Sequence, residues 1–219
     1  MAKFLIVESD LATENLQAIR SLMERSAVYR RALAPVMAAI GLTGILAAIM
    51  GAFLHFPSAR AFVAFWLTVS AICLAEAFFL SRREALLDAE SFWSPPAKRV
   101  ARALSPAFFA GVVASLPFLA YDSPPLPPSP PTHSVWPLVP AWMVLYGCGL
   151  HAAGFFMPRG VKLFAWAFVL CGCALGLAGL SLGGNLSLAA ANWAMGALFG
   201  GTHWAYGGYL YYTEKRRLV

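Results

Sequence analysis

Long apolar stretches separated by short polar segments dominate this sequence. A hydrocarbon core of about 30 Å needs about 20 apolar residues in helical form, and six stretches reach that length. A helix satisfies its backbone hydrogen bonds within its own segment, as lipid requires. The pattern therefore predicts an all-α, polytopic membrane protein. Its six predicted transmembrane helices cover residues 32–54, 61–80, 103–121, 135–156, 161–182 and 186–212.

The first 31 residues have a different pattern. Leu11, Leu16 and Ile19 follow an approximate helical stripe, while Glu14 and Arg20 lie on the opposite face. This predicts an amphipathic amino-terminal helix on the cytoplasmic face, lying on the membrane or docked on a partner. A plain extension of the first span explains the same pattern, and the sequence leaves both interpretations open.

Positive charge is distributed unevenly about the six stretches. If each stretch crosses the bilayer, all but one of the 16 Lys and Arg residues face the same compartment, and the exception is Arg60. The positive-inside rule then places both termini in the cytoplasm, including the basic tail 213–219. We expect a multi-pass protein of the bacterial cytoplasmic (inner) membrane.

Composition supports lipid as the main solvent of this chain. Apolar residues make up 60% and charged residues 12%, against about 45–50% and about 25% in soluble domains. The net charge of +6 comes from residues that flank the apolar stretches, so we expect contact with lipid headgroups and no nucleic-acid binding. All four cysteines lie inside apolar stretches, which favours reduced thiols and no metal site.

Three ionisable residues lie within the predicted spans. Glu76, His151 and His203 fall at similar distances from the cytoplasmic ends of their spans, and ionisable groups in lipid are functional candidates by default. A cluster of the three would bind a proton or a small ligand. Alternatively, each side chain bonds a neighbouring helix separately, with Glu76 reaching towards the arginines that follow it. No cofactor is predicted, although His151 and His203 are the pair that would ligate haem or chlorophyll.

Glycines recur at four-residue spacing in the last two stretches. Small residues at this spacing let helix backbones approach closely. We expect helices four to six to pack tightly, with self-association or docking on other membrane proteins as the alternative. The glycines concerned are Gly172, Gly176, Gly179, Gly183, Gly196 and Gly200.

Short motifs resemble those of a group of uncharacterised bacterial six-span membrane proteins. Met-Glu-Arg-Ser at 23–26 precedes the first span, Leu-Val-Pro-Ala at 138–141 opens the fourth, and His-x-x-Tyr-Gly at 203–207 lies in the last. The resemblance implies the six-span topology and no known activity. Because an amide is usual there at the position of His151, it favours His203 and Tyr206 as a packing or hydrogen-bonding pair.

Recognised catalytic motifs are missing from the sequence. It contains no Walker loop, no Gly-x-Ser-x-Gly, no His-Glu-x-x-His and no paired carboxylates within the spans. The first functional hypothesis is therefore a non-enzymatic protein acting through interaction, as an accessory, assembly or regulatory subunit of a membrane complex. The alternative is a binding or transport protein for a small ligand or proton that uses Glu76, His151, His203 and Tyr206.

Overall fold

The described part of the chain is helical throughout. The computed structural model describes residues 33–87, 95–120, 135–158, 160–182 and 186–215, which contain helices and no strand. The first described helix covers Leu33–Leu54. It is followed by α2 (Ala59–Leu87), α3 (Pro95–Ala120), α4 (Leu138–Ala153), α5 (Gly160–Ser181), α6 (Leu188–Met195), the π-helical segment η1 (Gly196–Gly201) and α7 (Thr202–Lys215).

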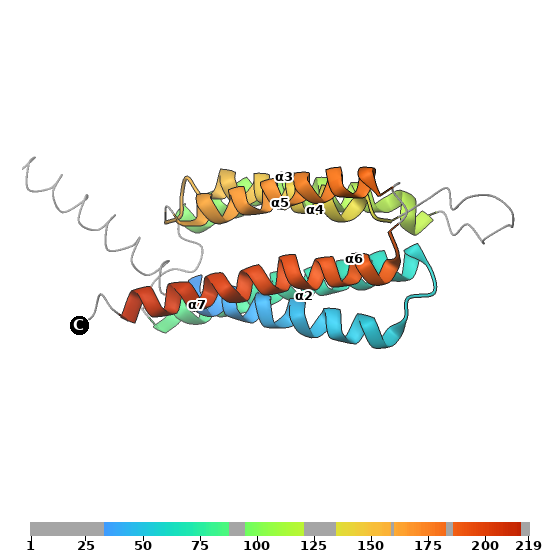
Figure 1. Ribbon diagram of the computed structural model, residues 1–219. Helices are drawn as coiled ribbons and strands as arrows, with labels where there is room; N and C mark the ends of the chain where they lie inside the picture. The colour runs from blue at the N-terminus through green and yellow to red at the C-terminus, as the bar shows by residue number, and fades with distance from the viewer. Residues whose placement is uncertain (1–32, 88–94, 121–134, 159, 183–185, 216–219) are drawn as a thin grey trace, which may run out of the picture.

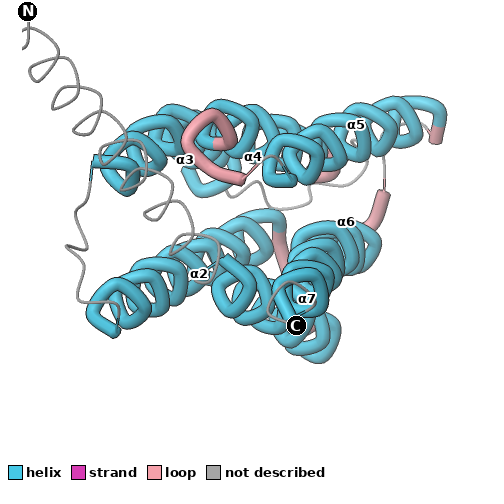
Figure 2. The backbone as a smooth tube through the Cα atoms, turned by 90° about the vertical axis from the view of Figure 1, so that its left-hand side faces the viewer, coloured by secondary structure: helices cyan, strands magenta, loops and turns pink. Residues whose placement is uncertain are grey.

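The helices form two layers (Figure 1). The first helix, α2 and the continuous rod of α6, η1 and α7 make one layer, and α3, α4 and α5 make the other. Within the second layer, α4 packs against both α3 and α5. Figure 2, turned by 90° from Figure 1, shows the same two layers, one above the other. We call them the α2 layer and the α4 layer.

Four described helices are long and apolar enough to cross a membrane: Leu33–Leu54, Ala59–Leu87, Ala97–Ala120 and Gly160–Ser181. The predicted all-α fold is confirmed at this level. The fourth apolar stretch forms a shorter helix, α4, of 16 residues. The sixth is divided by η1, so that no single α-helical piece of it reaches the length of a span.

Helix ends differ from the predicted spans for identifiable reasons. The structure extends α2 to Leu87, because the polar residues after Leu80 favour helix even though they are not apolar. Proline suits the first turn of a helix, and α3 starts at Pro95, well before the predicted residue 103. Gly154 ends α4 at Ala153, and its backbone N–H donates to Leu150 O at 2.8 Å. The predicted amino-terminal helix lies outside the described residues.

Glycine contacts join helices within each layer. Gly172 and Gly176 face Pro140 of α4, and Gly179 faces Trp136. In the other layer, Gly196 and Gly200 lie against the first helix, where Gly200 meets Gly44. The glycines of the sixth apolar stretch thus pack on the first helix, whereas those of α5 pack on Pro140 and Trp136. Gly183 lies outside the described residues.

Arg60 joins the two layers at one end of the molecule. Its Nε donates to Leu119 O at 2.9 Å and its Nη2 donates to Ala120 O at 3.3 Å. These carbonyls end α3, where the helix dipole favours a cation. The one basic residue predicted to face the outer compartment therefore caps a helix in the opposite layer.

Candidate functional site

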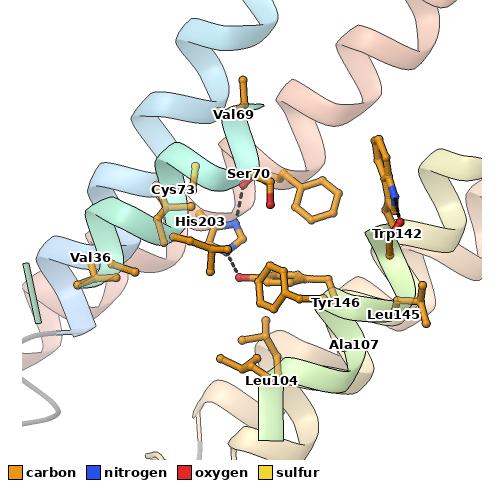
Figure 3. Close-up of a pocket in the computed structure, with 18 of the residues that line it drawn as sticks. Val36, Val69, Ser70, Cys73, Leu104, Ala107, Trp142, Leu145, Tyr146 and His203 are labelled. Carbon is orange, nitrogen blue, oxygen red and sulfur yellow. Dashed lines mark hydrogen bonds between the residues drawn. The ribbon is translucent and has the colours of Figure 1, made fainter. Parts of the chain in front are cut away.

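A pocket of about 310 Å³ lies between the α2 layer and the α4 layer. Residues of the first helix, α2, α3, α4, α6, η1 and α7 line it, and most of them are aliphatic or aromatic. No charged side chain lines the pocket in the described part of the chain. Its polar groups come mainly from Ser70, Cys73, Tyr146 and His203 (Figure 3). We call this space the interlayer pocket.

His203 and Tyr146 make a hydrogen bond across the two layers. His203 Nε2 and Tyr146 Oη are 2.7 Å apart, and His203 Nδ1 is 2.6 Å from the carbonyl oxygen of Phe199. A carbonyl only accepts, so Nδ1 carries a proton and donates it to Phe199 O. In a neutral imidazole Nε2 is then the acceptor, and the Tyr146 hydroxyl donates to it. The lone pairs on Tyr146 Oη remain available as acceptors.

The π-helical segment η1 positions His203. In its sequence, Gly-Ala-Leu-Phe-Gly-Gly, three glycines weaken regular α-helix, and Gly200 lies so close to Gly44 that a side chain has no room there. Two carbonyls in this segment accept side-chain hydrogen bonds from the next turn, Leu198 O from Thr202 Oγ1 and Phe199 O from His203 Nδ1. Single π-helical turns are frequent at functional sites because they redirect the side chains that follow.

Aromatic rings of α5 surround the imidazole. Phe164 lies edge-on to His203 with ring centroids 5.0 Å apart, and the centroid of Phe168 lies 5.4 Å away. Phe168 also packs edge-on against Tyr146 at 5.0 Å. Because His203 is only 1% exposed, the polar pair is closed off on this side and has access only to the pocket.

The wall of the pocket opposite Tyr146 belongs to α2. Ser70 and Cys73 are three residues apart and therefore lie on one face of this helix. Both line the pocket that His203 also lines (Figure 3). Cys73 is a free thiol. The pocket thus combines hydroxyl, thiol and imidazole groups with mainly apolar walls.

The structure does not bring Glu76, His151 and His203 together. Glu76 Oε1 accepts a hydrogen bond of 2.6 Å from Thr43 Oγ1 of the first helix. His151 contacts the rings of Phe155 and Trp166, with centroids 5.8 Å away in each case. Among the described residues no group of three His, Cys, Asp or Glu side chains is arranged to hold a metal ion.

His151 lies farther along α4 than Tyr146, the residue of this helix that contacts His203. It lies two residues before the last residue of α4 and five residues after Tyr146, which is about 7.5 Å along the axis. Both nitrogens of His203 are already hydrogen-bonded, so the two histidines do not form the facing pair that bis-histidine haem ligation requires.

Tyr206 lies near His203 without bonding to it. Its ring stacks on Phe164, with centroids 4.5 Å apart and planes 10° from parallel. Its hydroxyl is buried and has no hydrogen-bond partner within the described part of the chain. Of the two alternatives expected for His203 and Tyr206, packing or a hydrogen bond, the described residues contain no hydrogen bond between them, because His203 bonds Tyr146. Both rings instead pack on Phe164.

Sequence reasoning missed the hydrogen bonds of Tyr146 and Thr43 and the position of Ser70 and Cys73 in the pocket wall. A hydroxyl or thiol in an apolar helix is common and carries little signal by itself. The partner of Tyr146 lies 57 residues away and follows only from the packing of the two layers.

Comparison with known proteins adds no relative. No protein-family model, curated protein or solved structure matches this chain. The resemblance to bacterial six-span proteins therefore stays a prediction that depends on the three short motifs.

Proposed function

We propose that this chain is a six-span membrane protein that binds a small, neutral, mainly apolar molecule in the interlayer pocket. The observation that carries the proposal is the pocket itself, about 310 Å³ of space between two helix layers with the Tyr146–His203 pair in its wall. Sites for small molecules are typically concave, mostly apolar and of about 300–1,000 Å³, with a few polar groups that fix orientation.

The polar groups of the pocket limit the chemistry of the ligand. No charged side chain faces the space from the described residues, so an ionic ligand would lose its hydration without compensation. Tyr146 Oη has spare lone pairs and Ser70 has a hydroxyl that donates or accepts. A hydrocarbon body carrying one or two hydroxyl or carbonyl groups satisfies both the walls and these groups.

The membrane topology is part of the same proposal. α4 and the rod of α6, η1 and α7 run alongside the four longer helices in Figure 1, which supports counting them as the fifth and sixth spans. The charge distribution supports a bacterial inner membrane with both termini in the cytoplasm. The role is non-enzymatic. A role as an accessory or regulatory subunit stays a prediction. Binding of a lipid-soluble molecule in the pocket is compatible with a regulatory role.

Photolabelling tests the proposal with a defined probe. Octanol carrying a diazirine group would be irradiated with the purified full-length protein in lipid, and adducts would be mapped by peptide mass spectrometry. We expect adducts on pocket residues of α2 and α4 that decrease when excess unlabelled octanol is added. Ser70→Phe would fill the pocket and remove them, whereas Thr68→Phe, on the exposed side of the same helix, would leave them in place. Adducts spread evenly over the lipid-facing surfaces, insensitive to Ser70→Phe and to competition, would contradict the proposal.

A further inference from the structure

We infer that the cytoplasmic end of the α4 layer binds an anionic phospholipid, whose phosphate group is held by Lys162 and His151 beside the exposed ring of Phe155. We call this place the headgroup site. None of the three residues lines the interlayer pocket, so the inference does not depend on a ligand there. The proposed topology enters only in naming the leaflet that supplies the lipid.

Cations gather at one end of the α4 layer. Lys98, Arg99 and Arg102 lie near the start of α3, and Lys162 lies two residues after the start of α5. Arg99 Cζ is 5.8 Å from the ring centroid of Phe156, which brings the start of α3 beside the turn between α4 and α5. The described part of this layer contains no Asp or Glu. Anionic headgroups of the adjoining leaflet are a source of the missing counter-charge.

The basic residues of α2 have a different setting. Arg82 and Arg83 directly precede Glu84, so a carboxylate within the same helical turn offsets part of their charge. These two arginines need an external anion less than the cations of the α4 layer do. The comparison makes Arg82 a suitable control position.

The ring of Phe155 organises the headgroup site. It is 67% exposed, and Lys162 Nζ lies 3.5 Å from its centroid. The face of an aromatic ring attracts an ammonium group and so holds the end of the lysine side chain in place. Because the ring offers no oxygen or nitrogen acceptor, the N–H groups of Lys162 Nζ stay available to phosphate oxygens.

His151 adds a second donor at the same ring. Its imidazole lies edge-on to Phe155, with centroids 5.8 Å apart. Neither of its nitrogens has a hydrogen-bond partner in the described part of the chain, and neither is among the fully buried polar atoms. An imidazole carries at least one N–H in its neutral and charged forms. Lys162 and His151 therefore present two unused donors from two helices beside one ring.

The neighbouring surface favours a lipid over a phosphate compound in water. Leu163 directly follows Lys162 and is 76% exposed, and Trp166, one turn later on α5, is 50% exposed. The Trp166 ring also contacts His151, with centroids 5.8 Å apart. A soluble anion would leave these apolar side chains uncovered, whereas acyl chains cover them while the phosphate reaches Lys162. Tryptophan is also typical of the level of the headgroups.

Native mass spectrometry of the full-length protein tests the headgroup site. Phosphatidylglycerol or phosphatidylcholine with the same acyl chains would be added to the protein in detergent micelles. We expect phosphatidylglycerol adducts to survive activation that removes the detergent and the phosphatidylcholine. Equal retention of the two lipids would overturn the inference. Excess sn-glycerol 3-phosphate should not displace the lipid, and displacement would assign the site to a soluble phosphate compound instead.

Matched variants locate the binding on the chain. Lys162→Gln should weaken retention of phosphatidylglycerol about fivefold, the usual effect of one cation near an anionic lipid surface. Lys162→Arg should restore it. Arg82→Gln removes the same charge from α2 and should retain the lipid as the parent does. Equal retention in Lys162→Gln and Arg82→Gln would show that net charge alone attracts the lipid, and the inference would be wrong.

His151→Phe provides a test that leaves every Lys and Arg in place. It keeps an aromatic ring beside Phe155 and removes the N–H donor, so retention of phosphatidylglycerol should fall while the thermal midpoint of the lipid-free protein stays close to that of the parent. Unchanged retention in this variant would remove His151 from the site and contradict the inference as stated.

Discussion

At the scale of single residues, the hydrogen bond between Tyr146 and His203 is the most informative contact in the molecule. It connects the α4 layer to the α2 layer through an imidazole that is 1% exposed. Both its nitrogens are satisfied, so the pair is complete without a ligand. A ligand in the pocket would meet the remaining lone pairs of the tyrosine oxygen, which makes Tyr146 the orienting group and His203 its support.

Tyr146→Phe should destabilise the protein because it removes the donor and leaves His203 Nε2 as a buried acceptor without a partner. Such groups cost about 1–3 kcal/mol. Thermal unfolding in detergent, followed by the loss of the monodisperse peak in size-exclusion chromatography, would measure the shift. Tyr209→Phe is the matched control, because Tyr209 is 61% exposed. Equal midpoints for the two variants would show that the Tyr146 hydroxyl contributes nothing to stability.

At the scale of helices, two kinds of contact hold the structure together. A close backbone contact joins two helices of the α2 layer, and the Arg60 cap joins that layer to α3. The first helix and the last rod meet through Gly44 and Gly200, and a Cβ atom on Gly44 would lie 2.8 Å from Gly200 Cα. Backbone atoms cannot give way as a flexible side chain does. This contact fixes the position of η1 and hence the direction of the His203 side chain.

Gly44→Ala should therefore destabilise the protein by about 1–3 kcal/mol, the usual cost of overpacking. Gly208→Ala makes the same chemical change where no other atom lies within 4 Å of the new Cβ. Alanine is the better helix former by up to about 1 kcal/mol, so this control should be neutral or slightly stabilising. Similar thermal midpoints for the two variants would mean that the first helix and the rod are not in close contact.

Arg60→Met should loosen the end of α3 by about 1 kcal/mol, because the last carbonyls of that helix lose a charged donor. Arg82→Met, at an exposed position near the other end of α2, is the control. Hydrogen exchange at the end of α3 would report the effect locally. Exchange that increases equally in both variants would assign the change to lost charge and not to capping.

Particular helices show how much of the fold was predictable from the sequence. Apolar length predicted the first helix, α2, α3 and α5, because burial in lipid depends on composition alone. It missed the end of α4, which depends on the turn at Gly154, and it did not predict η1, which depends on the close approach of Gly44. Glu76, His151 and His203 were each recognised as unusual. Their separation was not predictable, since it depends on which helix faces meet.

At the scale of the whole molecule, the question is whether all six rods cross the bilayer. α4 has 16 residues, or about 24 Å of helix, which is shorter than the hydrocarbon core. α4 packs against α3 on one side and α5 on the other, which favours its crossing together with them. The bilayer can also thin locally around a short span. Whether α4 crosses also decides on which side of the membrane the segments after it lie.

Reporter fusions would resolve the crossing of α4 and the orientation together. Alkaline phosphatase is active only outside the cytoplasm, so a fusion after Pro128 or Asn185 should be active. Fusions after Glu90, Pro158 or Val219 should be inactive, whereas green fluorescent protein at the same three positions should fluoresce. If α4 does not cross, the fusion after Pro158 becomes active, and the basic residues 159 and 162 then face the outer compartment. That result would break the charge asymmetry on which the six-span topology depends, whereas inactivity at Pro158 with activity at Asn185 requires both α4 and α5 to cross.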